Sequence, residues 1–243
     1  MATCNRTVTA RRLQPVHFLS ASRLYRLSGL CIFVTSCAAS SLWAQVVEVR
    51  AGNVYYSDRA GRARQITFGG TDSSAALSPD GEDIVFVRST SIRVEFNEPR
   101  ASRPIRDEIW VAPIQVPSRP RPIFRGIVSD GHFKYATFFL PRLSTDRHYC
   151  YFLIAWAAVE NAVVKLDIAS GSARVISPAV SYYIVGYGAY GGDLVVQKRK
   201  SYPEGSTYFF YLISPDGADL GFVGETDNDV REFLRRRKIV HPL

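Results

Sequence analysis

Hydrophobic and polar residues alternate along most of the chain after residue 45, in runs that short turns separate. Four stretches share one design, in which an alternating run, a turn and a second run follow one another. Alternation with a period of two is the pattern of a half-buried strand, so each stretch predicts a β-hairpin. The four stretches are residues 53–67, 108–124, 162–177 and 208–223.

A second repeated unit lies between these hairpins. Residues 75–87 match residues 141–153, with Leu77 and Leu143 separated by 66 positions, and residues 185–196 form a looser third copy. In each copy, a turn precedes a largely apolar strand. Hairpins that alternate in this way, at about 45–65 residues for each pair, are typical of the four-stranded blades of a β-propeller.

The predicted strands amount to one lone hairpin and three full blades. The predicted fold is therefore all-β: a small or incomplete propeller of about three and a half to four four-stranded blades. An incomplete ring would leave unpaired strand edges. Residues 227–238 predict a short C-terminal helix, because acidic residues begin the segment and basic residues end it, as the helix dipole favours. This helix is available to cover an edge.

Three segments follow one another within residues 53–88: residues 64–72 (RQITFGGTD), residues 76–81 (ALSPDG) and the apolar residues 84–87 (IVFV). This order resembles the WD-like repeat of the TolB-like β-propeller family. The resemblance implies a propeller fold and no particular function, because propellers carry many functions. Ser-Pro-Asp-Gly itself predicts a tight turn, since Pro presets φ, Asp bonds back to the main chain and Gly accepts a positive φ. Asp80 is therefore predicted to be a turn residue and not a catalytic one.

Residues 1–44 differ in composition from the rest of the chain. They hold five arginines, no acidic residue and three of the four cysteines, and an uncharged run extends from Leu27 to Val47. A basic start, an apolar core and a small residue before a polar one make a secretory signal peptide. Leu42 and Ala44 suit the pockets of signal peptidase, so we expect cleavage between Ala44 and Gln45.

Two other interpretations of this leader stay open. Residues 34–37 (VTSC) match a bacterial lipobox, which would make Cys37 the lipidated first residue of an outer-membrane lipoprotein in contact with the membrane. An uncleaved anchor is the remaining alternative. The favoured organisation is a signal peptide over residues 1–44, a propeller over residues 45–226 and a helical tail over residues 227–243, in a periplasmic or secreted protein.

The net charge of +8 comes largely from the leader. Without its five arginines, the 30 basic residues fall to 25 against 22 acidic residues, which is a net charge of +3. A body with this balance is not expected to bind nucleic acid. The body keeps one cysteine, Cys150, which excludes an internal disulfide or a cysteine zinc site within it.

The sequence offers no catalytic constellation. Nucleophilic catalysis needs a nucleophile, a base and an orienting group, and the body holds only three histidines: His132, His148 and His241. Cys150 lies in an apolar run and is predicted to be a core residue, with His148 in the preceding turn. Asp227-Asn228-Asp229 starts like a calcium loop but lacks the later Gly and Glu, so a helix cap is favoured. We predict no catalytic residue, no metal site and no cofactor.

One set of residues remains as a candidate site. In a propeller, the loops between the second and third strands of each blade share one face with the loops between blades. Three such loops, residues 89–107, 126–134 and 197–206, combine basic and aromatic side chains, and a solvated loop face without a partner would have the same composition. The predicted partner-binding residues are Arg93, Arg100, Arg103, Arg106, His132, Lys134, Lys198, Arg199, Lys200 and Tyr202.

These observations favour an exported, non-enzymatic propeller. It is expected to bind another envelope protein or an anionic ligand, such as a glycan or lipid of the envelope, through the basic loop face. The alternative is a propeller enzyme of the bacterial envelope, such as a lyase, a lactonase or a peptidase-associated domain. A further alternative is an accessory module whose unpaired strand edge is itself the interface.

Overall fold

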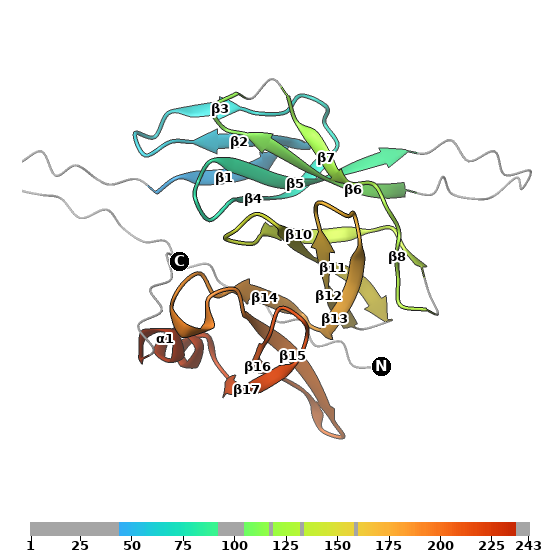
Figure 1. Ribbon diagram of the computed structural model, residues 1–243, viewed down its shortest axis with the longest axis vertical. Helices are drawn as coiled ribbons and strands as arrows, with labels where there is room; N and C mark the ends of the chain where they lie inside the picture. The colour runs from blue at the N-terminus through green and yellow to red at the C-terminus, as the bar shows by residue number, and fades with distance from the viewer. Residues whose placement is uncertain (1–43, 92–104, 117–118, 132–133, 158–159, 237–243) are drawn as a thin grey trace, which may run out of the picture. The chain divides into compact units, whose positions relative to one another are not determined.

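The computed structural model describes residues 44–91, 105–116, 119–131, 134–157 and 160–236, which belong to one compact unit. Successive antiparallel sheets follow one another along the chain (Figure 1). The first sheet has three strands, β1 (Val46–Arg50), β2 (Asn53–Ser57) and β3 (Ala63–Gln65). The second sheet has four strands, β4 (Asp72–Leu77), β5 (Asp83–Ser91), β6 (Ile105–Pro113) and β7 (Arg121–Phe124).

The third and fourth sheets repeat the order of the second. The third consists of β10 (Phe138–Leu143), β11 (Tyr149–Ala157), β12 (Glu160–Asp167) and β13 (Ala173–Pro178). The fourth consists of β14 (Ser181–Ile184), β15 (Leu194–Tyr202), β16 (Gly205–Ile213) and β17 (Asp219–Gly224). The remaining elements are a ribbon of β8 (Val128–Ser129) and β9 (Lys134–Tyr135), a 3-10 turn (Gly188–Tyr190) and the helix α1 (Asp227–Arg236).

Each four-stranded sheet is a meander in which every strand pairs with the next, which is the construction of a propeller blade. The four hairpins predicted from the alternating pattern are present as β2–β3, β6–β7, β12–β13 and β16–β17. The predicted all-β fold of three and a half to four blades with a short C-terminal helix is confirmed. The pattern did not predict β1 or the β8–β9 ribbon, because β1 is separated from β2 by only two residues and the ribbon strands are two residues long.

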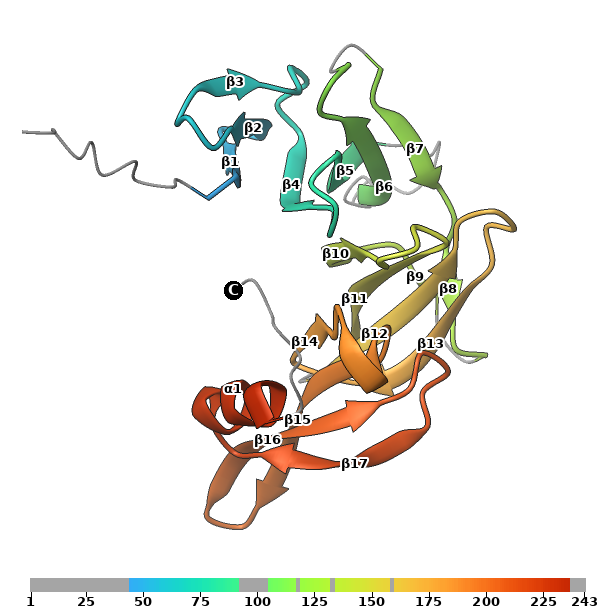
Figure 2. The ribbon, with the colours of Figure 1, turned by 60° about the vertical axis from the view of Figure 1, so that its left-hand side comes forward.

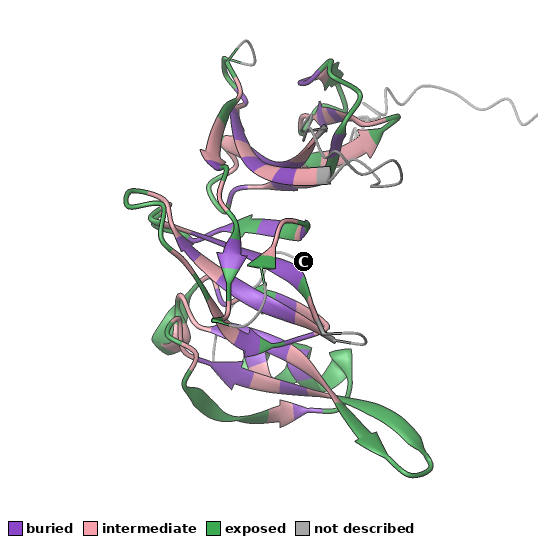
Figure 3. Ribbon diagram, turned by 90° about the vertical axis from the view of Figure 1, so that its right-hand side faces the viewer, coloured by how far each residue is buried: buried purple, intermediate pink, exposed green. Residues whose placement is uncertain are grey.

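Apolar clusters join each sheet to its neighbour in the chain. One cluster joins the first sheet to the second through Val54 and Phe86, and another joins the second to the third through Val87 and Phe152. A third joins the third sheet to the fourth through Tyr151. Figure 3 shows that the buried residues run along the middle strands of the sheets. Burial between sheets, at roughly 25 cal/mol for each Å² of apolar surface, is the main stabilising term of such an array.

The Ser-Pro-Asp-Gly segment forms the predicted tight turn between β4 and β5. The Gly81 N–H donates to the Ser78 carbonyl at 2.9 Å, and Gly81 has a φ of 74°. The Asp80 carboxylate accepts from the Ser78 hydroxyl at 2.6 Å and from the Glu82 N–H at 3.1 Å. These bonds place Asp80 in a turn role, as the sequence predicted.

The equivalent turn of the third sheet reaches across to this one. Arg147, in the turn before β11, donates hydrogen bonds to the carboxylates of Asp80 and Glu82 and lies 3.2 Å from that of Asp83. This interaction ties the turns of two neighbouring sheets together.

Helix α1 covers a face of the fourth sheet, whereas the sequence suggested that it would cover an edge. Val230 and Leu234 pack against Phe210 and Leu212 of β16. Figure 2 shows α1 beside the fourth sheet. The helix begins with a reciprocal cap, in which the Asp229 carboxylate accepts from Thr226 and the Asp229 N–H donates to the Thr226 hydroxyl at 3.2 Å. This confirms the predicted capping role of the acidic start. Within the described residues, no helix has the length and apolarity that crossing a membrane would require.

Candidate functional site

The residues predicted as the loop 197–206 are mostly strand. β15 continues to Tyr202 and β16 begins at Gly205, so a long two-stranded hairpin replaces the expected loop. Its register pairs Lys198 with Phe209 and Lys200 with Thr207. The expectation of a loop was wrong because residues 197–201 are all polar. They lack the apolar–polar alternation from which the other strands were predicted, although they are part of β15. Figure 3 shows the end of this hairpin, at the foot of the picture, as exposed.

One face of the hairpin combines lysines with aromatic rings. The Lys198 ammonium lies 5.0 Å from the centroid of the Tyr211 ring and 3.6 Å from the Asp219 carboxylate. The Phe222 ring, which is 56% exposed, lies 5.8 Å from the Tyr211 ring and 6.2 Å from the Phe209 ring. Lysine, tyrosine and phenylalanine side chains therefore form one continuous surface.

The surface extends toward the end of the hairpin. The Lys200 ammonium lies 5.4 Å from the centroid of the Tyr202 ring, which is 44% exposed. Because side chains alternate across a strand, Lys198, Lys200 and Tyr202 share this face. We call the surface formed by Lys198, Lys200, Tyr202, Phe209, Tyr211 and Phe222 the lysine–aromatic face.

Arg199 lies on the opposite face of the hairpin, opposite Tyr208 in the register. Its Nε atom is buried and has no hydrogen-bond partner among the described residues. Within the part of the chain that the structure describes, no carboxylate lies within 4.0 Å of the charged groups of Arg199 or Lys200. Their positive charge is therefore available to a partner.

The other predicted partner-binding residues fall into two groups. Arg106 is a strand residue of β6 that donates a hydrogen bond to the Arg125 carbonyl, and Lys134 begins β9 opposite Ser129. No hydrogen bond or ion pair between described residues joins either one to the β15–β16 hairpin. Arg93, Arg100, Arg103 and His132 lie outside the described residues, so the predicted convergence of all these loops stays a prediction.

A cluster that the sequence did not predict holds the β8–β9 ribbon against the third sheet. The Asp130 carboxylate accepts a hydrogen bond from the Tyr135 hydroxyl and another from the Trp156 indole N–H, both at 2.8 Å. Burial, with the hydrogen bond to Asp130 as a second cause, raises the pKa of Tyr135 to about 12. Tyr135 therefore stays protonated at physiological pH and acts here as a donor.

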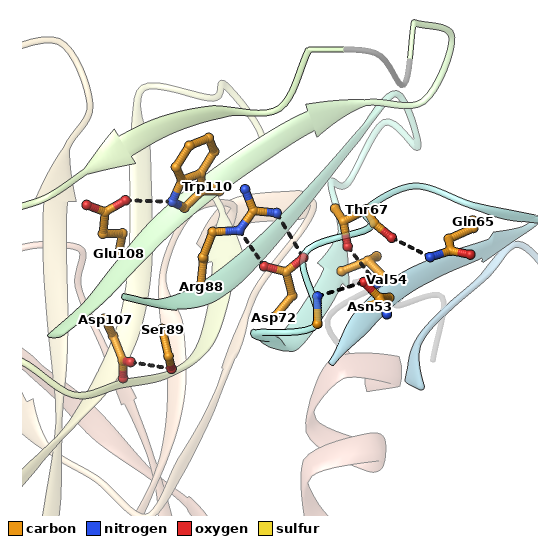
Figure 4. Close-up of polar contacts among 11 residues, drawn as sticks. Asn53, Val54, Gln65, Thr67, Asp72, Arg88, Ser89, Asp107, Glu108 and Trp110 are labelled. Atoms are coloured by element: carbon orange, nitrogen blue, oxygen red, sulfur yellow. Dashed lines mark hydrogen bonds and ion pairs between the residues drawn. The ribbon is translucent and has the colours of Figure 1, made fainter. Parts of the chain in front are cut away.

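A second unpredicted network lies on the second sheet, on its side toward the first sheet (Figure 4). Arg88 donates to the Asp72 carboxylate through Nε at 2.6 Å and Nη2 at 2.9 Å, and the Asp72 side chain is 0% exposed. The Arg88 guanidinium also lies 4.5 Å from the centroid of Trp110, whose indole N–H donates to Glu108 at 2.9 Å. Every charge in this network has a partner inside the protein, so we assign it a structural role.

A cavity of about 340 Å³ opens on the third sheet. Its lining residues are Tyr149, Lys165, Asp167, Ser170, Ser172 and Arg174. The two cationic groups of this lining, Lys165 and Arg174, both bind the Asp216 carboxylate, at 3.3 Å and 2.5 Å. The hydrogen bond from Lys165 is the main cause that lowers the pKa of Asp216. With Asp167 of the lining, the Asp216 carboxylate balances the two cationic charges.

The residues considered for catalysis take structural positions. Cys150 is buried in the core between the second and third sheets, and burial raises the pKa of its thiol well above its usual value. His148 is an exposed turn residue whose Nδ1 lies 3.2 Å from the Asp146 carboxylate. In the described part of the chain, no group of three or more His, Cys, Asp and Glu residues is arranged to hold a metal ion.

Comparison with known proteins gave no matching family model and no matching curated protein. Similar solved structures include TolB from Acinetobacter baumannii, with 15% identity, a TM-score of 0.35 and coverage of 72% of this chain and 49% of that one. They also include the β-propeller domain of the trilobed protease from Pyrococcus furiosus, with 16% identity, a TM-score of 0.41 and coverage of 72% and 49%. A gluconolactonase from Xanthomonas campestris matches with 14% identity, a TM-score of 0.42 and coverage of 74% and 57%.

These likenesses concern the fold. The chain is similar in this sense to TolB and to TolB-like propeller domains, at low sequence identity. It spans about half the length of the TolB and trilobed protease chains that it matches.

Proposed function

We propose that this protein is an exported binding module of the bacterial envelope, active in the periplasm. Its lysine–aromatic face, together with Arg199 on the opposite face of the same hairpin, binds an anionic partner. The partner is either an acidic segment of another envelope protein or an anionic ligand such as a glycan or lipid. The observation that carries the proposal is the array of lysines and aromatic rings on β15, β16 and β17, in which Lys200, Tyr202 and Phe222 are exposed.

The charge distribution supports binding more than stability. Lys200 and Arg199 have no carboxylate nearby among the described residues, and like charges on one short hairpin repel one another. An anion would relieve this repulsion and increase the rate of association. The exposed rings of Tyr202 and Phe222 add apolar contact area beside the charges, which is the composition of a binding surface.

Export is supported by the sequence of the leader. The Gln45 side chain donates to the Tyr56 hydroxyl at 2.6 Å. A mature chain that begins at Gln45 keeps this contact with the first sheet.

The test compares two triple variants that remove the same charge. The first is Lys198→Ser, Arg199→Ser, Lys200→Ser. The control is Arg59→Ser, Arg62→Ser, Arg121→Ser, which removes exposed arginines near the β2–β3 and β6–β7 turns. These turns join the last two strands of their sheets, so they lie at the opposite strand ends from a turn such as β15–β16, which joins the second and third strands. Association with immobilised poly-L-glutamate, as the anionic probe, is measured by interferometry between about 50 and 300 mM salt. The Debye length is above about 10 Å at the lower end of this range and below about 8 Å at the upper end.

We expect the hairpin variant to associate roughly tenfold more slowly than the control at low salt, with the difference shrinking as salt rises. Its melting temperature should stay close to that of the control, because charged side chains that are at least partly exposed contribute little to stability. Equal effects of the two variants, or binding that salt does not change, would show that the lysine–aromatic face is only solvated. Turnover of lactone or peptide substrates by the purified protein would contradict the non-enzymatic role.

A further inference from the structure

The first sheet lacks a strand that the other sheets have. In the second, third and fourth sheets, the strands β4, β10 and β14 each lie at the edge of the meander, hydrogen-bonded to the following strand. The order of the first sheet is β1-β2-β3, and the β2–β3 hairpin corresponds to the third and fourth strands of a blade. β1 therefore occupies the second position of a blade, and the described residues provide no strand for the first position.

The hydrogen-bonding groups at this position follow from the β1–β2 register. Ala51 and Gly52, with φ of 47° and 72°, form a two-residue turn, so Arg50 and Asn53 exchange hydrogen bonds next to it. In an antiparallel ladder the bonded pairs alternate, so Glu48 and Val46 also point their main-chain groups at β2. The N–H and C=O groups of Val47 and Val49 therefore point to the side of β1 that β2 does not occupy.

Apolar side chains beside this position are less covered than their counterparts. Leu77 of β4 is half-buried, whereas Leu143, which lies 66 positions later at the same place in the third sheet, is only 3% exposed. Ala75 and Pro141 show the same contrast, half-buried against buried. Leu143 packs in a cluster with Ala76 of β4, the first strand of the sheet before it, and Leu77 has no such strand before it in the described chain.

We propose that an extended segment of a partner polypeptide adds to the β1 edge as the missing first strand of the first blade. Main-chain bonds to Val47 and Val49 would hold it, and alternate side chains would cover Leu77 and Ala75. This is the strand-addition mode of peptide recognition, in which the backbone supplies affinity and pockets for alternate side chains supply specificity.

The surroundings of β1 define the chemistry of the partner segment. The side chains that face the second sheet must be apolar and of moderate size, because Val47, Val49, Ala75 and Leu77 all border that side. The opposite side chains would lie beside Glu48 and Arg50, which pair with each other and leave no net charge. The partner segment is therefore an alternating, uncharged strand, in contrast to the anionic partner of the lysine–aromatic face.

A second copy of this chain fits the edge less well than a single strand. In a dimer, two β1 strands would pair around a two-fold axis perpendicular to the joined sheet. The second sheets of both copies would then lie on the same side of that joined sheet. Strand β4 lies against β1 on that side, so both copies would require the same space. Figure 2 shows β4 next to β1 and β2.

The test uses the neutral peptide acetyl-Ser-Val-Thr-Val-Thr-Val-Ser-amide as the probe. Amide exchange of Val47 and Val49 in the mature full-length protein is followed by NMR, because an added strand slows exchange of the N–H groups that it binds. We expect exchange of these two amides to slow at least tenfold at saturating peptide, at both 50 and 300 mM salt, and to do so equally in the Lys198→Ser, Arg199→Ser, Lys200→Ser variant. This independence separates the outcome from that of the proposed function.

Two variants of Val49 control for the main-chain contact. Val49→Pro removes an N–H that points away from β2, so the peptide should no longer slow exchange at Val47. The variant should still fold, because proline is tolerated on an edge strand. Val49→Ala keeps the N–H and should retain the effect. No slowing, retained binding by Val49→Pro, or equal slowing at the edges β7 and β17 would overturn the proposal. Slow exchange of Val47 and Val49 without peptide would overturn it as well, because the position would then be filled by this chain or a second copy.

Discussion

Cys150 shows how far a single residue can be interpreted from sequence. Its place between Tyr149 and Tyr151 in an apolar run predicted a core thiol, and the structure places it with no exposed surface between the second and third sheets. Burial opposes formation of the thiolate, the reactive form, and raises the pKa of this thiol.

We expect Cys150 to resist thiol reagents at pH 8 until the chain unfolds, as measured by mass spectrometry after timed labelling. Cys150→Ala should lower the free energy of unfolding by about 1–2 kcal/mol through the small cavity that it leaves. Rapid labelling of the native protein would contradict this placement.

The Asp72–Arg88 pair could not be predicted from the sequence. The residues are 16 positions apart, and their pairing depends on the register of β4 against β5. The third sheet holds Phe138 and Ile154 at the equivalent places, so the same position accepts either an ion pair or an apolar pair.

This equivalence gives a prediction about Asp72. Asp72→Ala should destabilise the protein by about 3–5 kcal/mol, because it leaves the Arg88 charge without its partner in a largely buried site. The double variant Asp72→Phe, Arg88→Ile should be less destabilising than Asp72→Ala alone. Chemical denaturation measures both free energies, and a double variant that is the less stable of the two would contradict the equivalence of the two sheets.

At the scale of the element, turns were easier to predict than strand ends. Ser-Pro-Asp-Gly fixed the β4–β5 turn through local chemistry that does not depend on the rest of the fold. The ends of β15 and β16 carry Lys198 to Tyr202, and their strand conformation depends on cross-strand pairing that composition does not reveal. The sequence therefore assigned the basic residues Lys198, Arg199 and Lys200 to a loop, whereas the structure places them in a strand.

The ion pairs of Arg147 with Asp80 and Glu82, called the Arg147 clasp below, make the contact between the second and third sheets sensitive to acid. Burial alone would raise the pKa of Asp80, but hydrogen bonds from Ser78, Glu82 and Arg147 outweigh it and lower the pKa below its usual value. A carboxyl with a lowered pKa in the folded state contributes stability above its unfolded pKa, and this stability is lost as the pH falls through the folded pKa.

We therefore expect the stability of the protein to fall as the pH is lowered below about 4, with a part of this loss due to the clasp. Arg147→Gln should lower the free energy of unfolding at pH 7 by roughly 0.2–1 kcal/mol, since the groups are partly exposed. The variant should also lose stability less steeply between pH 4 and pH 2. Denaturant titrations of both proteins across this range measure the difference, and parallel pH profiles would show that the clasp contributes nothing.

At the scale of the whole molecule, the sequence predicted the class of fold and the number of repeats. Alternation and turn spacing are local signals, and they recur in every sheet. The sequence could not show that the first sheet has three strands or that α1 lies on a face of the fourth, because both depend on packing between distant residues. Four of the predicted partner-binding residues, Arg93, Arg100, Arg103 and His132, lie outside the described residues.

The leader gives a prediction for the whole chain in its host. We expect the mature protein to begin at Gln45, because Leu42 and Ala44 precede it in a signal-peptide pattern. Intact-mass measurement of the protein isolated from its host decides this. A lipid-modified species that begins at Cys37 would show that the lipoprotein interpretation is correct instead.

Repeat arrays face the hazard of polymerisation, because an uncovered apolar end of one molecule can stack on the end of the next and generate an open filament. Here the outward face of the last sheet is occupied by Val230 and Leu234 of α1, and the outward face of the first sheet carries Glu48 and Arg50. The helix thus blocks stacking of another molecule on the fourth sheet. The charged side chains of β1 make the first sheet a poor surface for stacking. The same molecule that keeps a strand position open for a partner is in this way protected against growing into a fibre of its own copies.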